Sequence, residues 1–161
     1  MKEQAMSSSP TLRERLVDEL KLAMKSGDKA RVGAVRLIQA AVKDKDIEVR
    51  GAGRGQASDD EILSVMQKMI KQRQESAAIY AANARPELAE TENGEIAVIS
   101  SFMPKQLSED EVKAAIAAAI TEAGATSMKD MGKVVAVLKA GYAGQMDFAK
   151  ASGLVKSALS G

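Results

Sequence analysis

The sequence contains no cysteine, histidine or tryptophan, and only two tyrosines and two phenylalanines among its 161 residues. Without cysteine there is no disulfide, thiolate nucleophile or cysteine-ligated zinc. Without histidine there is no imidazole to serve as a general base or a metal ligand. We therefore predict no catalytic residue, no metal site and no cofactor. Any catalysis would rest on Asp, Glu, Lys, Ser or Tyr side chains.

Long apolar runs and a strong net charge are also missing. No apolar run approaches the roughly 20 residues needed to span a bilayer, and the start, MKEQAMSSSP, lacks the apolar core of a signal peptide. We expect a cytoplasmic protein without a membrane segment, in which residues 1–10 form a disordered leader. Because 23 basic residues face 22 acidic ones, binding to nucleic acid would need a local basic patch.

Helix-forming residues dominate what is present. Hydrophobic residues make up 45% of the chain, and 28 residues are alanine, whereas strands favour β-branched and aromatic residues. Capping boxes begin at Thr11, Ser58 and Ser108. The pattern predicts an all-α protein, with an N-terminal domain of about four helices at 11–104 and a smaller C-terminal three-helix domain at 105–161.

Two segments contain glycine at informative places. Residues 50–57 hold three glycines in five positions without the order of a phosphate-binding loop, so we interpret them as a flexible connector. Gly132 lies inside a predicted helix, where glycine costs about 1 kcal/mol relative to alanine. We expect it to permit close helix packing.

Three charged residues lie on the apolar faces of the third and fourth predicted helices. At about 100° per residue, Arg73 points in the direction of its helix's apolar side chains, and so do Glu92 and Glu95 on the next helix. A charge in a core must be paired. We expect an ion pair between Arg73 and either glutamate that fixes the register of the two helices, or alternatively a ligand-binding charge cluster.

A basic stripe follows the second predicted helix. Lys29, Arg36 and Lys43 are spaced by seven residues, with Lys25 near the start of that helix. Such a row could track a phosphate backbone. The alternative is an ordinary solvated face whose charge is diluted by three acidic residues, Asp44, Asp46 and Glu48.

Seven short segments resemble the YqeY family, whose members are free-standing relatives of the tail domain of GatB, a component of the glutamine-dependent Asp-tRNA/Glu-tRNA amidotransferase. The segments are 22–29, 35–38, 70–76, 92–96, 103–107, 130–133 and the turn at Asp147. The family's last segment is usually closer to Ala-Asp-Gly, whereas this chain has Met146-Asp147-Phe148.

The resemblance implies two helical domains and a role beside tRNA. In the amidotransferase the tail domain helps to hold tRNA, some glutaminyl-tRNA synthetases carry a similar appendage, and the glutaminase and kinase chemistry resides in other domains. The family association is with carbon-nitrogen ligases that use glutamine as amido-N-donor, but kinship of fold does not transmit catalysis. The resemblance thus implies a tRNA-binding accessory protein whose partner is an amidotransferase or an aminoacyl-tRNA synthetase.

If the chain binds tRNA, its near-neutral charge requires a local basic face. The candidate phosphate contacts are Lys25, Lys29, Arg36, Lys43, Lys129, Lys133 and Lys139. A protein-interaction adaptor without RNA affinity is the alternative. An independent amidotransferase-type enzyme is disfavoured by the missing Cys and His and by the absence of a glycine- and serine-rich amidase segment.

Overall fold

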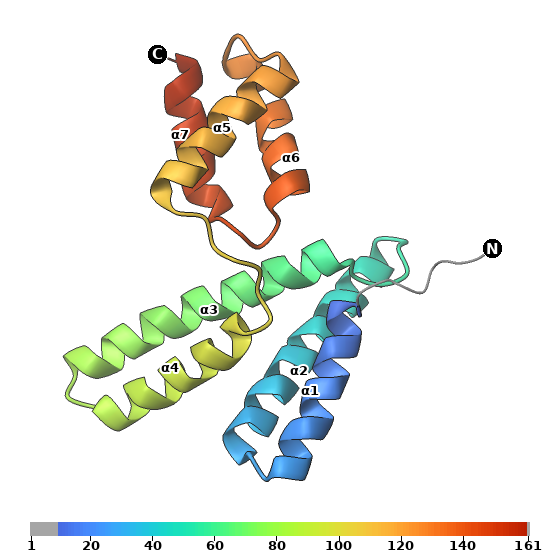
Figure 1. The fold of residues 1–161 in the computed structure, drawn as a ribbon, viewed down its shortest axis with the longest axis vertical. Coiled ribbons are helices and arrows are strands. Elements are labelled where there is room, and N and C mark those ends of the chain that lie inside the picture. Colours follow the sequence, from blue (N-terminus) through green and yellow to red (C-terminus); the bar gives the residue numbers. More distant parts are fainter. Residues whose placement is uncertain (1–9, 161) are drawn as a thin grey trace. The chain divides into compact units, whose positions relative to one another are not determined.

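The computed structural model describes residues 10–160, and its regular structure in that range is helical without strands (Figure 1). The predicted all-α fold is confirmed for this range. Of the predicted leader, residues 1–9 lie outside the described residues. No helix within 10–160 combines the length and apolarity needed to cross a membrane. The elements are α1 (Leu12–Ser26), α2 (Lys29–Gly51), α3 (Asp59–Ala82), α4 (Pro86–Ser100), α5 (Glu109–Ala123), η2 (Met128–Asp130), α6 (Met131–Tyr142) and α7 (Phe148–Ser160).

The predicted capping boxes begin three of these helices. The hydroxyl groups of Thr11, Ser58 and Ser108 each accept a hydrogen bond from the backbone N–H three residues later, and a glutamate there accepts from the capping residue's own N–H. Gly27 and Gly124 end α1 and α5 in the left-handed conformation, which suits glycine because it has no Cβ.

The first compact unit extends to Phe102 and contains α1 to α4. In Figure 1, α1 lies alongside α2 and α3 lies alongside α4. The Arg15 guanidinium lies over the Phe102 ring and donates to the Ser101 and Phe102 carbonyls just after α4. The largest fully buried side chains of this unit come from all four helices and from Phe102, which follows α4. Those in the helices are Leu16, Val35, Ile38, Val49, Ile62, Met66 and Ile99.

The second unit begins at Met103 and contains α5, α6 and α7. Its core residues are Ala115, Ile116, Ala119, Val134, Leu138, Met146, Ala151 and Val155. The Asp147 carboxylate accepts from the N–H groups of Ala149 and Lys150 and so caps the start of α7. Ser127 makes no side-chain capping bond, because the short 3₁₀ turn η2 precedes α6.

Candidate nucleic-acid interface

The outer face of α2 carries three cations in one line. Asp28 caps the helix by accepting from the Arg31 N–H. The buried residues of α2 (Ala34, Val35, Ile38, Val42 and Val49) all fall on one side. Lys29, Arg36 and Lys43 are exposed on the opposite side and form no ion pair with any described residue. Seven residues at 1.5 Å each put successive cations about 10 Å apart along the axis.

Two of the three acidic residues that dilute this stripe are held by other basic groups. Asp46 accepts from the Arg13 guanidinium, with Arg13 Nη1 2.9 Å from Asp46 Oδ2, and also from the Ala57 N–H at 2.9 Å. The Arg13 hydrogen bond, helped by that of Ala57, lowers the pKa of Asp46 to about 2. Glu48 pairs with Lys45. Asp44 is the one acidic residue of α2 that has no ion-pair partner among residues 10–160. Because the other two acids are paired with cations outside the stripe, the stripe is more positive than the sequence suggests.

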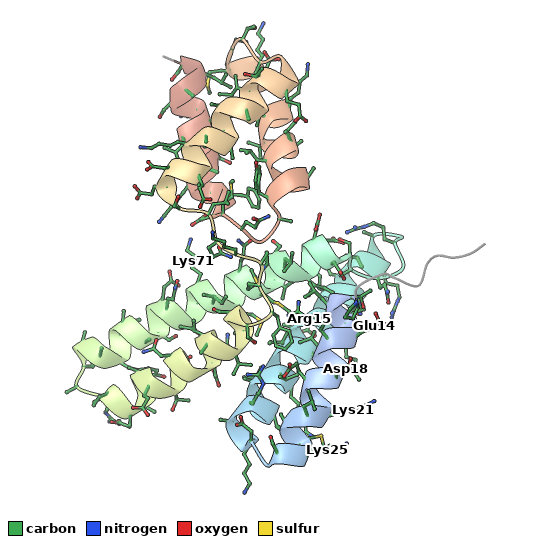
Figure 2. The ribbon with its side chains drawn as sticks, viewed as in Figure 1. Glu14, Arg15, Asp18, Lys21, Lys25 and Lys71 are labelled. Carbon is green, nitrogen blue, oxygen red and sulfur yellow. The ribbon has the colours of Figure 1, made fainter. Side chains whose placement is uncertain are left out.

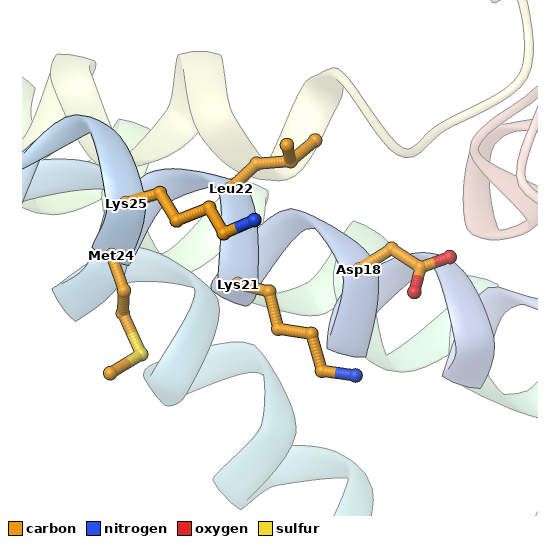
Figure 3. A pocket seen from close by; sticks show the side chains of 5 residues that line it. All are labelled: Asp18, Lys21, Leu22, Met24 and Lys25. Carbon is orange, nitrogen blue, oxygen red and sulfur yellow. The ribbon is translucent and has the colours of Figure 1, made fainter.

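Lys25 lies in the last turn of α1 and not on the helix that carries the stripe. Figure 2 shows it on α1, along an outer face that also carries Glu14, Asp18 and Lys21. Lys25, Lys21, Asp18, Leu22 and Met24 line a shallow, open hollow there (Figure 3). The Asp18 carboxylate lies on the same surface as the two ammonium groups, so this face presents both signs of charge. It is therefore less uniformly positive than the row of Lys29, Arg36 and Lys43.

The glycine-bearing segment after α2 contacts the rest of its unit at Arg54 and Ala57, whereas its flexibility stays a prediction. Ala57 is 3% exposed, and its carbonyl accepts from the Arg13 guanidinium at 3.0 Å. Arg54 donates to both carboxylate oxygens of Glu61, at 3.0 and 2.8 Å, and this interaction lowers the pKa of Glu61 to about 2. Arg54 is therefore engaged within the chain.

The structure brings Arg73 together with Glu95. Arg73 Nε donates to Glu95 Oε1 at 3.0 Å, which links α3 to α4, and Arg73 Nη1 donates to the Met69 carbonyl at 3.3 Å. Glu92 forms no ion pair within 10–160. The expectation that these charges lie in the core is wrong: no charged residue in the described range is buried, and the Arg73 and Glu95 side chains are 17% and 28% exposed. Their long side chains reach the rim of the helix interface instead.

The remaining predicted cations lie in the C-terminal unit. Lys129 is exposed in η2, and Lys139 is exposed in the last turn of α6. The Lys133 ammonium is 3.9 Å from Asp130 Oδ1, with its side chain 73% exposed. Gly132 was expected to permit close helix packing. This expectation is wrong within the C-terminal unit, because a Cβ at Gly132 would meet no atom within 4 Å.

Two exposed lysines of α7, Lys150 and Lys156, are missing from the predicted set. The signal that could have found them is their spacing of six residues, which repeats that of Lys133 and Lys139 on α6. Among residues 10–160, no three acidic side chains are grouped so that they could hold a metal ion.

Comparison with known proteins gives one family. A family model described as Yqey-like protein matches residues 13–159. "Altered inheritance of mitochondria protein 41, mitochondrial" from Saccharomyces cerevisiae is 32% identical over 88 residues, which cover 55% of this chain and 46% of the relative. The proteins of the same name from Lachancea thermotolerans and Kluyveromyces lactis are each 29% identical over 66% of this chain and 57% of their own length. The chain thus spans about half the length of these relatives.

Proposed function

This chain belongs to the YqeY family, and from that premise we propose that it is a tRNA-binding accessory protein of a glutamine-dependent amidotransferase or an aminoacyl-tRNA synthetase. The observation that supports the proposal is the outer face of α2. Lys29, Arg36 and Lys43 are exposed there, and no ion pair with a described residue neutralises them. A row of free cations binds phosphates and releases their counterions.

The proposal assigns no reaction to this chain itself. Cysteine and histidine are absent from the sequence, and the chemistry of an amidotransferase or synthetase is left to the partner. The accessory role is to hold RNA. Location in the cytoplasm stays a prediction, whereas the names of the yeast relatives describe those proteins as mitochondrial.

The experiment is a titration of the full chain against total cellular tRNA, read by fluorescence anisotropy at about 50 and 200 mM salt. The test variant is Lys29→Glu/Arg36→Glu. The matched control is Lys68→Glu/Lys71→Glu, because these two lysines are exposed on α3 of the same unit. We expect wild-type binding to weaken with salt, with a slope reduced by about two in the test variant.

Either of two results would overturn the proposal. Wild-type protein that binds no tRNA at the lower salt concentration would exclude direct RNA binding. An equal loss of affinity in test and control variants would mean that bulk charge, and not the α2 face, governs the interaction.

A protein-interaction adaptor is the second candidate, and exposed apolar residues beside the stripe favour it. Ile47, one turn beyond Lys43, is 56% exposed, and Leu37 is 43% exposed next to Arg36. Apolar side chains beside cations suit an acidic amphipathic helix of a protein partner. A partner captured by the chain and retained after ribonuclease treatment, but lost in Leu37→Ser/Ile47→Ser, would favour this function over RNA binding.

A further inference from the structure

The outward face of α1 carries a row of four charged residues whose two signs are segregated along the helix. Glu14 and Asp18 lie toward the N-terminus, and Lys21 and Lys25 lie toward the C-terminus (Figure 2). Their spacings of four, three and four residues keep the row within an arc of about 60°, at about 100° per residue. The buried residues of α1 lie on the opposite side of the helix, and all four charged residues are exposed.

No opposite charge within the described part of the chain neutralises this row. Asp18, Lys21 and Lys25 form no ion pair with any described residue. Glu14 Oε1 accepts from the Thr11 N–H at 2.8 Å as part of the capping box. Because that donor is neutral, the Glu14 carboxylate keeps its charge at the surface as well. All four charges of the row are therefore available to a partner.

The helix dipole accounts for only part of this order of charges. It favours acids near the start and bases near the end of a helix, but its effect falls off within the first and last turns. It therefore covers Glu14 and Lys25, whereas Asp18 and Lys21 lie in the middle of α1. Each of these two has a like charge four residues away, which disfavours a helix, and no ion pair joins them to each other. Their placement gains little within α1 and has a use in a contact outside it.

The charged row is complementary to itself when a second copy of α1 lies antiparallel to the first. Spacings that alternate between four and three residues follow the seam along which two helices pack in a coiled coil. In the antiparallel arrangement, Glu14 of each copy lies opposite Lys25 of the other. Asp18 of each copy likewise lies opposite Lys21 of the other. Both pairs are centred between positions 19 and 20, so one twofold axis there produces all of these contacts. A parallel arrangement would place like charges together.

Exposed apolar side chains border the charged row on both sides. Val17, Leu22 and Met24 are 44%, 60% and 55% exposed. By helical spacing, Val17 and Met24 lie along one edge of the row and Leu22 lies along the other. A twofold axis keeps equivalent edges of the two copies together, so Val17 of one copy comes opposite Met24 of the other. Leu22 and Met24 also line the open hollow in Figure 3, which leaves room for a side chain of the second copy.

We propose that α1 is a self-association surface, at which a second copy of this chain binds antiparallel about a twofold axis. The charged row sets the direction and register of the two helices, and burial of the apolar edges drives their association. One helix from each copy gives a small, reversible interface of less than about 1,200 Å². This association uses α1 and does not rest on the proposed binding of RNA by α2.

The test measures the mass of the full chain by sedimentation equilibrium at concentrations from about 10 μM to about 1 mM. At about 50 mM salt the wild type should shift from monomer toward dimer, and about 500 mM salt should reduce that shift because it screens exposed charges. Asp18→Lys and Lys21→Glu each convert two ion pairs of the dimer into two like-charge contacts. Each variant should therefore dimerise about tenfold more weakly than wild type.

The decisive variant exchanges the two charges, as Asp18→Lys/Lys21→Glu. It has the net charge of wild type and restores opposite charges across the antiparallel seam, so it should recover wild-type dimerisation. An equimolar mixture of the two single variants should form a heterodimer for the same reason. Lys71→Glu is the matched control, because Lys71 is exposed in the middle of α3, and it should dimerise like wild type. Circular dichroism melting verifies that each variant is folded.

Three results would overturn the proposal. Wild type that stays monomeric at about 1 mM would exclude a second copy as the occupant and leave this face to another partner. Single charge reversals that dimerise as Lys71→Glu does would place the contact elsewhere on the chain. A folded Asp18→Lys/Lys21→Glu variant that fails to recover dimerisation would exclude the antiparallel pairing.

Discussion

Replacing Asp46 by asparagine should destabilise the N-terminal unit by about 2 kcal/mol. The Asp46 carboxylate joins three elements: it lies on α2, accepts from Arg13 on α1, and accepts from the Ala57 N–H just before α3. Its side chain is 16% exposed, so solvent screens these interactions only partly. The asparagine keeps one oxygen for the Ala57 N–H but loses the charge, and its amide donors face a guanidinium.

The magnitude follows from the pKa of Asp46. The Arg13 hydrogen bond is the largest cause that lowers this pKa from 3.8 to about 2, and each pKa unit corresponds to about 1.4 kcal/mol. Because the folded-state pKa lies below the unfolded one, the stabilisation is fully present above about pH 4 and is lost as the pH falls toward 2. The stability gap between wild type and variant should therefore close over that window.

Urea unfolding followed by tyrosine fluorescence is the assay. The sequence has two tyrosines, Tyr80 and Tyr142, so a Tyr142→Phe background leaves a reporter in the N-terminal unit alone. Asp44→Asn is the matched control, because Asp44 is exposed two residues away on the same helix. Its effect should stay within about 0.5 kcal/mol. A loss for Asp46→Asn no larger than that of the control at pH 7, or a gap that persists at pH 2, would refute the reasoning.

Three further predictions concern stability. Arg73→Ala should lower the unfolding free energy of the N-terminal unit by about 1 kcal/mol, since its pair with Glu95 is partly exposed; an unchanged urea midpoint would show that the pair contributes nothing. Ala84→Gly should raise the unfolding free energy of the N-terminal unit by about 0.5 kcal/mol, because Ala84 has φ 57°, where glycine is unstrained. A lower urea midpoint than that of wild type would contradict this. Leu138→Ala should cost the C-terminal unit about 2 to 5 kcal/mol, since Leu138 is 0% exposed; thermal melting of this variant like wild type would exclude a core role.

Much of the fold could be predicted because its signals are local. The capping boxes at Thr11, Ser58 and Ser108 join residues three apart, so the pattern of side chains alone specifies where these helices begin. The apolar periodicity of each helix is local in the same sense. Ser127 is the counterexample: it resembles a cap in sequence, but the chain forms a 3₁₀ turn before α6 and the hydroxyl group makes no capping bond.

The candidate site could be predicted only in part, because the sequence places cations on a helix but not their neutralising partners. The spacing of Lys29, Arg36 and Lys43 put them on one face, and their exposure follows from the apolar residues opposite. Whether Arg73 pairs with Glu92 or Glu95 was open, because both lie on the same side of α4. The packing of α3 against α4 selects Glu95.

The sequence by itself determined the helices, the helix starts marked by capping boxes, and the basic row on α2. Only the tertiary structure decided how positive that row is. Asp46 belongs to the same helix, but a guanidinium 33 residues earlier in the chain binds it. The same guanidinium fixes the Ala57 segment, 44 residues away from it. Helix starts depend on neighbours three or four residues apart, whereas these partners meet only when α1, α2 and α3 pack together.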